Sequence, residues 1–225
     1  MTGKDVSARS GLSLRLLALI ESGLANPTLS SLDDLAEALD VTVVSLLTDD
    51  VRVARPVALL GLRGAGKSTI GTALGEALGW PFVELDRRIE QESGLGLTTL
   101  FELHGEEHVR HLEARVVAGV LSADQCVVIA CGGGIVTAKD TYAALRARAL
   151  TVWLKAAPQE HWDRVRAQGD ERPMAKRSSA RAELDALWYA RRPLYAQAEL
   201  HVDTSALGVA EAVAAIVDVA RRDLS

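Results

Sequence analysis

The chain has 225 residues, of which 48% are hydrophobic and 24% are charged, and its formal net charge is −5 at pH 7. This composition excludes disordered and fibrous classes, and the length suits one α/β domain with a smaller attached module. No apolar run approaches the roughly 18 residues that span a bilayer, and the N-terminus lacks the pattern of a secretory signal. We therefore expect a cytoplasmic location and no membrane partner.

Residues 1–50 show a helical pattern. One apolar stripe consists of Leu12, Leu16, Leu19 and Ile20, and a second consists of Leu32, Leu35, Ala36 and Leu39. The segment SGLANP at 22–27 separates the two stripes, which predicts amphipathic helices on either side of a break. The segment from Asp49 to Arg55 is polar, lacks periodicity and leads to Pro56, so a linker is predicted here, with its bounds at residues 51–55.

The whole net charge falls in this first part of the chain. Residues 1–50 hold three basic and eight acidic side chains, whereas residues 51–225 are neutral overall. An acidic module is a poor electrostatic match for a DNA backbone.

From residue 56 to residue 225, short apolar runs alternate with helical stretches. The runs are Val57–Leu60, Phe82–Leu85, Val127–Ala130, Thr151–Leu154 and His201–Asp203. Such alternation predicts an α/β fold with a five-stranded parallel sheet, covered by helices on both faces and binding ligands beyond the carboxyl ends of its strands. Cys126 and Cys131 flank the third run, and their spacing fits neither a zinc site nor a disulfide framework, so we expect two buried thiols.

The first run leads into GLRGAGKS, which fits the phosphate-loop pattern G-x-x-x-x-G-K-[ST] between a strand and a helix. Its glycines let the backbone curl around a phosphate so that amide groups face the anion. Lys67 is expected to reach the β- and γ-phosphates of a nucleotide, and Ser68 is expected to bind Mg²⁺. The nucleotide-binding residues predicted in this segment are Gly61, Gly64, Ala65, Gly66, Lys67, Ser68 and Thr69.

Further candidates follow the later runs. Asp86 directly follows the second run, where its carboxylate can face an acceptor hydroxyl and a metal, although it could equally cap the next helix. Arg110 lies in a highly charged helical segment, and alone it would be read as a solvated surface residue. Gly132–Gly134 follow the third run and let the backbone pack closely against a small ligand. Arg172 and Arg191 lie in polar segments, where single arginines are usually solvated.

Taken together and in this order, these residues resemble the shikimate kinase family. Members are small P-loop enzymes, similar to nucleoside-monophosphate kinases, that move the γ-phosphoryl group of ATP to the 3-hydroxyl of shikimate. The resemblance covers residues 56–225. It implies that this protein binds ATP, Mg²⁺ and shikimate and releases shikimate 3-phosphate.

The resemblance also implies a role for each residue. Arg110 and Arg191 are expected to hold the shikimate carboxylate, since a guanidinium pairs bidentately with a planar carboxylate. Arg172 resembles the lid arginine that closes over the phosphates, and Arg164 resembles the arginine that stacks on adenine. The implied catalytic residues are Asp86 as candidate base, Lys67 and Arg172. The implied acceptor-binding residues are Asp86, Arg110, Gly132, Gly133, Gly134 and Arg191.

One position departs from the family's pattern. Where the family usually has an aspartate two residues before Asp86, this chain has Glu84. The extra methylene displaces the carboxylate by about 1 Å and changes how water-bound Mg²⁺ is held. No aspartate ends the third run, so the predicted metal ligands are Ser68, Glu84 and Asp86, and catalysis is expected to continue at a changed rate.

Residues 2–48 resemble helices two to five of a repressor-type helix-turn-helix domain of the XRE/Cro kind. The likeness rests on the short turn at Ser10-Gly11 and on the stop at residues 21–23. In such domains the helix that begins near Ser13 enters the major groove, which places Ser13 and Arg15 near base edges. The first helix of the domain is absent, so we expect specific DNA binding only from a longer form. A helical dimerisation or packing module fits the same pattern equally well.

The fusion of the two parts leaves three functions open. The favoured one is a shikimate kinase, because every acceptor residue is present. The second is a regulator of aromatic-acid catabolism whose kinase-like part senses benzoyl-CoA, a group to which residues 151–174 are also similar. The third is a kinase for another small hydroxy acid.

Overall fold

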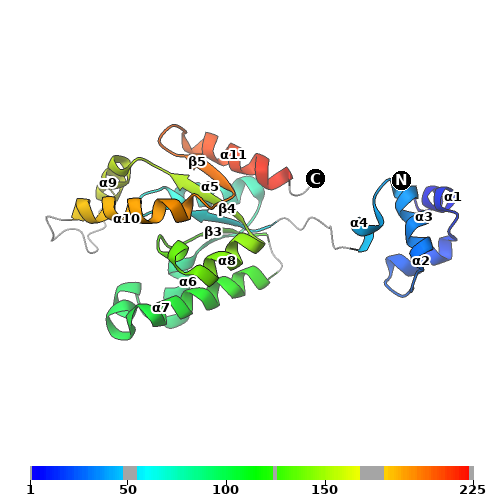
Figure 1. The fold of residues 1–225 in the computed structure, drawn as a ribbon, viewed down its shortest axis with the longest axis horizontal. Helices are drawn as coiled ribbons and strands as arrows, with labels where there is room; N and C mark the ends of the chain where they lie inside the picture. Colours follow the sequence, from blue (N-terminus) through cyan, green and yellow to red (C-terminus); the bar gives the residue numbers. More distant parts are fainter. Residues whose placement is uncertain (1, 48–54, 124–125, 168–179, 223–225) are drawn as a thin grey trace. The chain divides into compact units, whose positions relative to one another are not determined.

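The computed structural model describes residues 2–47, 55–123, 126–167 and 180–222. The chain divides into two compact units, residues 1–53 and 54–225. We call them the first and the second unit (Figure 1). In the described ranges, no helix combines the length and the apolar character needed to cross a membrane.

Four helices make up the described part of the first unit. They are α1 (Gly3–Ser10), α2 (Leu14–Glu21), α3 (Leu29–Leu39) and α4 (Val43–Leu47). A hydroxyl side chain begins each of the first three, because Thr2, Ser13 and Thr28 each accept a hydrogen bond from a backbone N–H in the first turn. The buried core is small and consists of Leu17, Leu35, Ala36 and Ala38.

The second unit is built on a five-stranded sheet of order β2-β3-β1-β4-β5, in which every pairing is parallel. The strands are β1 (Val57–Leu60), β2 (Phe82–Glu84), β3 (Val128–Ala130), β4 (Leu150–Lys155) and β5 (Leu200–Asp203). The predicted fold class is therefore confirmed. The apolar runs located the strands well because a parallel sheet is covered on both faces and its strands are apolar without interruption.

Helices cover both faces of this sheet (Figure 1). Val57 and Leu59 point to the face that packs against α5 (Lys67–Leu78) and α11 (Val209–Arg222). Ala58 and Leu60 point to the opposite face, which packs against other helices. These include α6 (Leu85–Ser93), α7 (Leu97–Ser122), α8 (Lys139–Arg148) and α10 (Ala180–Tyr195). The described part of the second unit also contains the 3-10 turn η1 (Ile135–Thr137) and α9 (Pro158–Ala167).

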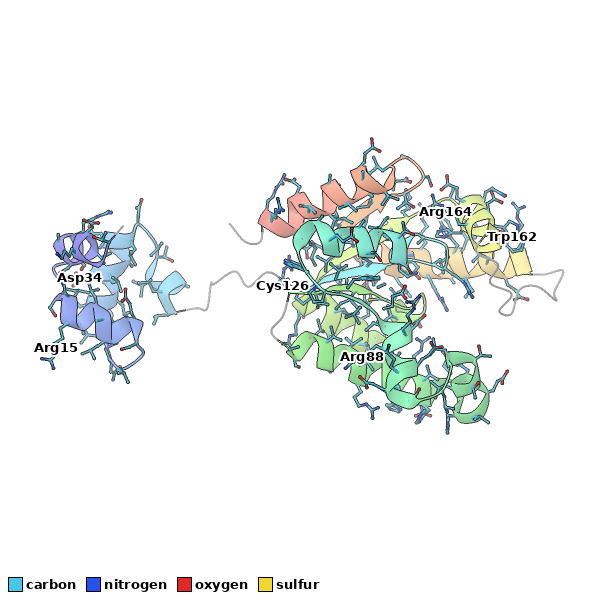
Figure 2. The ribbon with its side chains drawn as sticks, turned by 180° about the vertical axis from the view of Figure 1, so that it is seen from behind. Arg15, Asp34, Arg88, Cys126, Trp162 and Arg164 are labelled. Atoms are coloured by element: carbon cyan, nitrogen blue, oxygen red, sulfur yellow. The ribbon has the colours of Figure 1, made fainter. Side chains whose placement is uncertain are left out.

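The two cysteines differ in exposure. Cys131 is buried, as expected, and burial raises the pKa of its thiol. Cys126 is only partly buried, so the expectation of a second buried thiol is wrong (Figure 2). It lies two residues before the first residue of β3.

Candidate functional site

The loop between β1 and α5 has the backbone shape that a phosphate needs. Gly61, Gly64 and Gly66 have φ angles of 147°, 77° and 88°, a region that residues with a Cβ rarely adopt. A Cβ at Gly61 would lie 2.8 Å from the carbonyl oxygen of Leu154. Helix α5 begins directly after Gly66, so its N-terminal amides and its dipole face the loop. The loop can therefore hold an anion.

Lys67 folds back over this loop. Its Nζ donates hydrogen bonds to the carbonyl oxygens of Gly61, at 2.8 Å, and Leu62, at 3.0 Å. Burial lowers the pKa of Lys67 to about 8, although the negative charges of Asp86 and Glu84 oppose the shift. Phosphate oxygens placed at the loop would supply further negative charge and favour the charged form of the amine.

The predicted metal ligands lie beside the loop. The hydroxyl of Ser68 donates a hydrogen bond to Oε1 of Glu84, and Oε2 of Glu84 pairs with Nε of Arg87 at 2.6 Å. Asp86 lies in the first turn of α6. A hydroxyl with one or two carboxylates, completed by phosphate oxygens and water, is a donor set that suits Mg²⁺. In the described residues, no cluster of three His, Cys, Asp or Glu side chains could hold a metal ion.

Arg110 faces the glycine turn that follows β3. Its Nη1 donates to Oε2 of Glu113 at 2.8 Å, and its Nη2 donates to Oε1 of Glu106 at 3.2 Å. A Cβ at Gly134 would lie 2.6 Å from Nη2 of Arg110, so glycine is required there for this close approach. Helix α7 breaks at Gly105, just before this segment, where φ is 77° and ψ is 173°. Arg110 is therefore partly buried and paired with two carboxylates beside the glycine turn, and its role in binding a substrate stays a prediction.

Asp86 and Arg191 reach the same turn from other elements. A Cβ at Gly132 would lie 2.9 Å from Oδ1 of Asp86. Nη1 of Arg191, on α10, donates to the carbonyl oxygen of Gly133 at 3.1 Å. The structure thus gathers the expected acceptor residues of α6, α7, the turn after β3 and α10 around Gly132–Gly134.

Two residues of this cluster were missed in the sequence. Glu113 is 5% exposed, and burial raises the pKa of its carboxyl group although the hydrogen bond from Arg110 opposes the shift. Tyr195 donates from its hydroxyl to the carbonyl oxygen of Gly133 at 2.6 Å. Their spacing was the available signal, because residues three or four apart lie on the same face of a helix. Glu113 follows Arg110 by three residues, and Tyr195 follows Arg191 by four.

A pocket of about 380 Å³ adjoins the phosphate loop. Arg164 of α9 lines it and is held by Thr204, whose Oγ1 accepts from Nη1 at 3.0 Å and whose carbonyl oxygen accepts from Nη2 at 2.9 Å (Figure 2). The volume of this pocket suits a small organic ligand. The other lining residues are Gly64, Ala65, Gly66, Thr69, Ile70, Leu207, Gly208 and Val209. Leu207 and Gly208 belong to the turn before α11 and Val209 begins that helix, and this segment carries no motif that would have pointed to it.

His161 joins α9 to the phosphate loop. It is 2% exposed, and its Nδ1 lies 3.0 Å from the carbonyl oxygen of Arg63. Because a carbonyl oxygen only accepts, Nδ1 carries the proton. Burial lowers the pKa of His161, and the positive charges of Lys67 and Arg164 lower it further. Sequence reasoning also missed this residue.

Some expected residues are not placed in the site. Arg172 lies outside the described residues, so its role as lid arginine stays a prediction. In the first unit, the hydroxyl of Ser13 accepts from the backbone N–H of Leu16 at 3.2 Å and caps α2. Arg15 is exposed on α2 (Figure 2). Ser13 thus has a structural role. Of the two predicted DNA contacts, Arg15 is the one whose positive charge could pair with DNA.

Comparison with known protein families gives one match for each unit. The model of a family described as shikimate kinase matches residues 63–221. The model of a family described as helix-turn-helix matches residues 1–46. The match of the first unit supports its predicted helix-turn-helix character, and together the two matches agree with the expected fusion.

Individual relatives agree with these matches. The shikimate kinase of Symbiobacterium thermophilum is 40% identical over 164 residues, which cover 72% of this chain and 94% of that protein. The shikimate kinase of Nitrobacter winogradskyi is 42% identical over 148 residues, which cover 66% and 68%. Among solved structures, a shikimate kinase from Acinetobacter baumannii in complex with shikimate is similar with a TM-score of 0.68 and 28% identity, over 73% of this chain and 92% of that one.

Proposed function

The chain belongs to the shikimate kinase family, and we propose that its second unit transfers the γ-phosphoryl group of ATP to the 3-hydroxyl of shikimate. The observation that carries the proposal is the cluster around the glycine turn after β3. There, a carboxylate and two guanidinium groups meet one backbone turn next to a phosphate loop. A small acid with a hydroxyl group matches this combination of charges.

The phosphate loop and the adjoining pocket would bind ATP. Backbone amides of the loop and the N-terminus of α5 would hold the phosphates, with Lys67 turning from its carbonyl partners toward the β- and γ-phosphates. The pocket lined by Arg164 would take the adenine, because a guanidinium can stack on an aromatic ring. The γ-phosphate would then point toward the glycine turn, since Gly133 and Gly61 are neighbours.

Ser68, Glu84 and Asp86 fit a magnesium site at the phosphates. Mg²⁺ held by these residues would neutralise the negative charge that develops on the phosphates during transfer. Asp86 would accept the proton of the attacking hydroxyl as the oxygen bonds to phosphorus and the bond to ADP breaks. Arg110 and Arg191 would hold the carboxylate of shikimate, and Glu113 would hold Arg110 in place.

A coupled assay for ADP release tests this proposal. With ATP, Mg²⁺ and shikimate, turnover on the order of 1–100 s⁻¹ is expected, the usual range for kinases. Lys67→Ala should remove transfer, because it deletes the cation that faces the phosphates. Turnover with another hydroxy acid but not with shikimate would move the proposal to the third function weighed from the sequence. Undiminished turnover in Lys67→Ala would contradict the phosphate-loop assignment.

A second candidate function, DNA binding, concerns the first unit. It is supported by the helix-turn-helix match to residues 1–46 and by the exposed Arg15 on α2. Selection of a binding sequence from random duplexes, followed by fluorescence anisotropy with Arg15→Ala, tests it. Binding of benzoyl-CoA is suggested by the resemblance to the regulators alone. A thermal-shift titration with this thioester would test it separately. A cytoplasmic location likewise stays a prediction.

A further inference from the structure

Tyr195 is fixed at both ends of its side chain. It is the last residue of α10 and is 2% exposed. Its ring stacks on Trp153 of β4, with ring centroids 5.9 Å apart and an interplanar angle of 15°. Its hydroxyl donates to the carbonyl oxygen of Gly133 at 2.6 Å, and burial raises the pKa of the phenol, so the hydroxyl keeps its proton. Tyr195 is therefore a buried hydrogen-bond donor, held by β4, to the turn of residues 132–134, which we call the acceptor turn.

The turn that receives this hydrogen bond is held between Tyr195 and the phosphate loop. A Cβ at Gly133 would lie 3.5 Å from the carbonyl oxygen of Gly61 and 3.7 Å from the hydroxyl oxygen of Tyr195. The position of Gly133 relative to the phosphates thus depends on a contact on each side. Removal of the hydroxyl would leave Gly133 with the phosphate-loop contact and the hydrogen bond from Arg191.

Arg191 donates to the same carbonyl oxygen but has a second task. A carbonyl oxygen has two lone pairs, and Arg191 occupies one of them at 3.1 Å. A guanidinium that turns to a substrate carboxylate gives up or weakens that hydrogen bond, because a charged partner is the stronger acceptor. Tyr195 is uncharged and buried, so it would keep its hydrogen bond when the acceptor binds.

We propose that Tyr195 is a positioning residue, which holds the carbonyl group of Gly133 so that the acceptor turn keeps its shape while Arg191 binds the substrate. This inference rests on the proposed shikimate site. In this proposal the carbonyl group of Gly133 has two donors: Tyr195 keeps its hydrogen bond throughout, and Arg191 changes its hydrogen bond when the substrate binds. It also predicts that the hydroxyl of Tyr195 contributes to the affinity for shikimate and not to the affinity for the nucleotide.

The test compares Tyr195→Phe with Tyr142→Phe. Tyr142 is 4% exposed, and its hydroxyl also donates to a backbone carbonyl oxygen, that of Leu194, at 3.1 Å. Each change removes one buried hydroxyl and keeps the ring, so both proteins are expected to fold. Affinities for shikimate and for ADP are measured by calorimetry on the full chain. Tyr195→Phe should weaken shikimate binding about three- to tenfold and change ADP binding less than about twofold, since one hydrogen bond is lost.

Tyr142→Phe should leave both affinities as in the wild type. Amide hydrogen exchange in a peptide that covers residues 131–136 gives a second readout, and exchange should be faster in Tyr195→Phe alone. Equal shikimate affinities for wild type and Tyr195→Phe would overturn the inference, as would equal losses for shikimate and ADP or equal losses in the two variants. Wild-type protein that binds no shikimate would overturn the proposed function and this inference with it.

Discussion

Ser68 and Glu84 lie 16 residues apart in the sequence and are joined by a hydrogen bond from the hydroxyl to Oε1 of the carboxylate. The contact links the start of α5 to the end of β2. The other carboxylate oxygen of Glu84 pairs with Arg87 at 2.6 Å, so both oxygens have a partner on the protein. The longer side chain that departs from the family's pattern therefore still reaches the hydroxyl expected to bind Mg²⁺.

Glu84→Gln should raise the free Mg²⁺ concentration needed for half-maximal activity by about tenfold, because a neutral amide binds a hard cation, or water on that cation, more weakly than a carboxylate does. The measurement is a Mg²⁺ titration of the coupled assay at fixed ATP. Arg88→Ala is the control, since Arg88 lies on the same helix as Arg87 and pairs with Glu92 (Figure 2). An unchanged Mg²⁺ requirement in Glu84→Gln would remove Glu84 from the metal site.

Arg110→Ala should raise the KM for shikimate about 10- to 100-fold, because a charge-assisted hydrogen bond to the substrate carboxylate is worth about 1.5–3 kcal/mol. The KM for ATP should change little, since Arg110 lies at the glycine turn after β3 and not at the phosphate loop. Arg191→Ala should behave in the same way. Steady-state kinetics with each substrate varied in turn measure both constants. If the KM for ATP rose with that for shikimate, the separation into two subsites would be wrong.

The sheet could be predicted because its strands are apolar on both faces and so stand out in the sequence. The bounds of β1 were predicted to the residue, and those of the other strands to within one residue. The phosphate loop could be predicted because its shape depends on glycines at fixed positions. Both are local features, which need no knowledge of distant neighbours.

Two of the residues that were missed, Tyr195 and His161, act across long sequence separations. Tyr195 contacts Gly133 from 62 positions away, and His161 contacts Arg63 from 98 positions away. Helical spacing could place Tyr195 beside Arg191, but no local pattern distinguishes a tyrosine or histidine that binds a backbone carbonyl from one that fills the core. Cys126 was wrongly expected to be buried because it flanks an apolar run that forms a buried strand. Packing at strand ends is set by the tertiary fold and not by the local sequence.

The buried His161 gives stability a dependence on pH. Burial lowers its pKa from the ordinary value of 6.5, so below that pH the unfolded chain binds a proton that the folded protein does not. The contribution is therefore fully present above pH 6.5 and is lost as pH falls toward the lowered pKa. Lys67 and Arg164 favour the neutral ring, and Glu160 opposes them.

His161→Asn should lose less stability than the wild type when the pH falls from about 7.5 to about 5, because asparagine keeps a donor near the position of Nδ1 but does not titrate. Urea unfolding at a series of pH values measures the free energy of unfolding of both proteins. Curves that stay parallel over this range would show that His161 contributes no such dependence.

Two helical glycines should respond to alanine with opposite signs. In an open helix interior, Gly→Ala stabilises by about 0.5–1 kcal/mol, and at Gly119 of α7 an added Cβ would meet no atom within 4 Å. At Gly75 of α5, a Cβ would lie 2.9 Å from the carbonyl oxygen of Trp80 and 3.4 Å from Cβ of Phe82. Gly75→Ala should therefore cost about 1–3 kcal/mol, as overpacking does.

The close approach at Gly75 has a consequence for the site, because it seats α5 against the segment that enters β2 and so brings Ser68 to Glu84. Thermal unfolding should show a higher midpoint for Gly119→Ala and a lower one for Gly75→Ala, relative to the wild type. Gly75→Ala should in addition need more Mg²⁺ for half-maximal activity, whereas Gly119→Ala should not. A rise in stability in both variants would mean that α5 can move away from β2 without cost, and the distance between Ser68 and Glu84 would then not be set by this glycine.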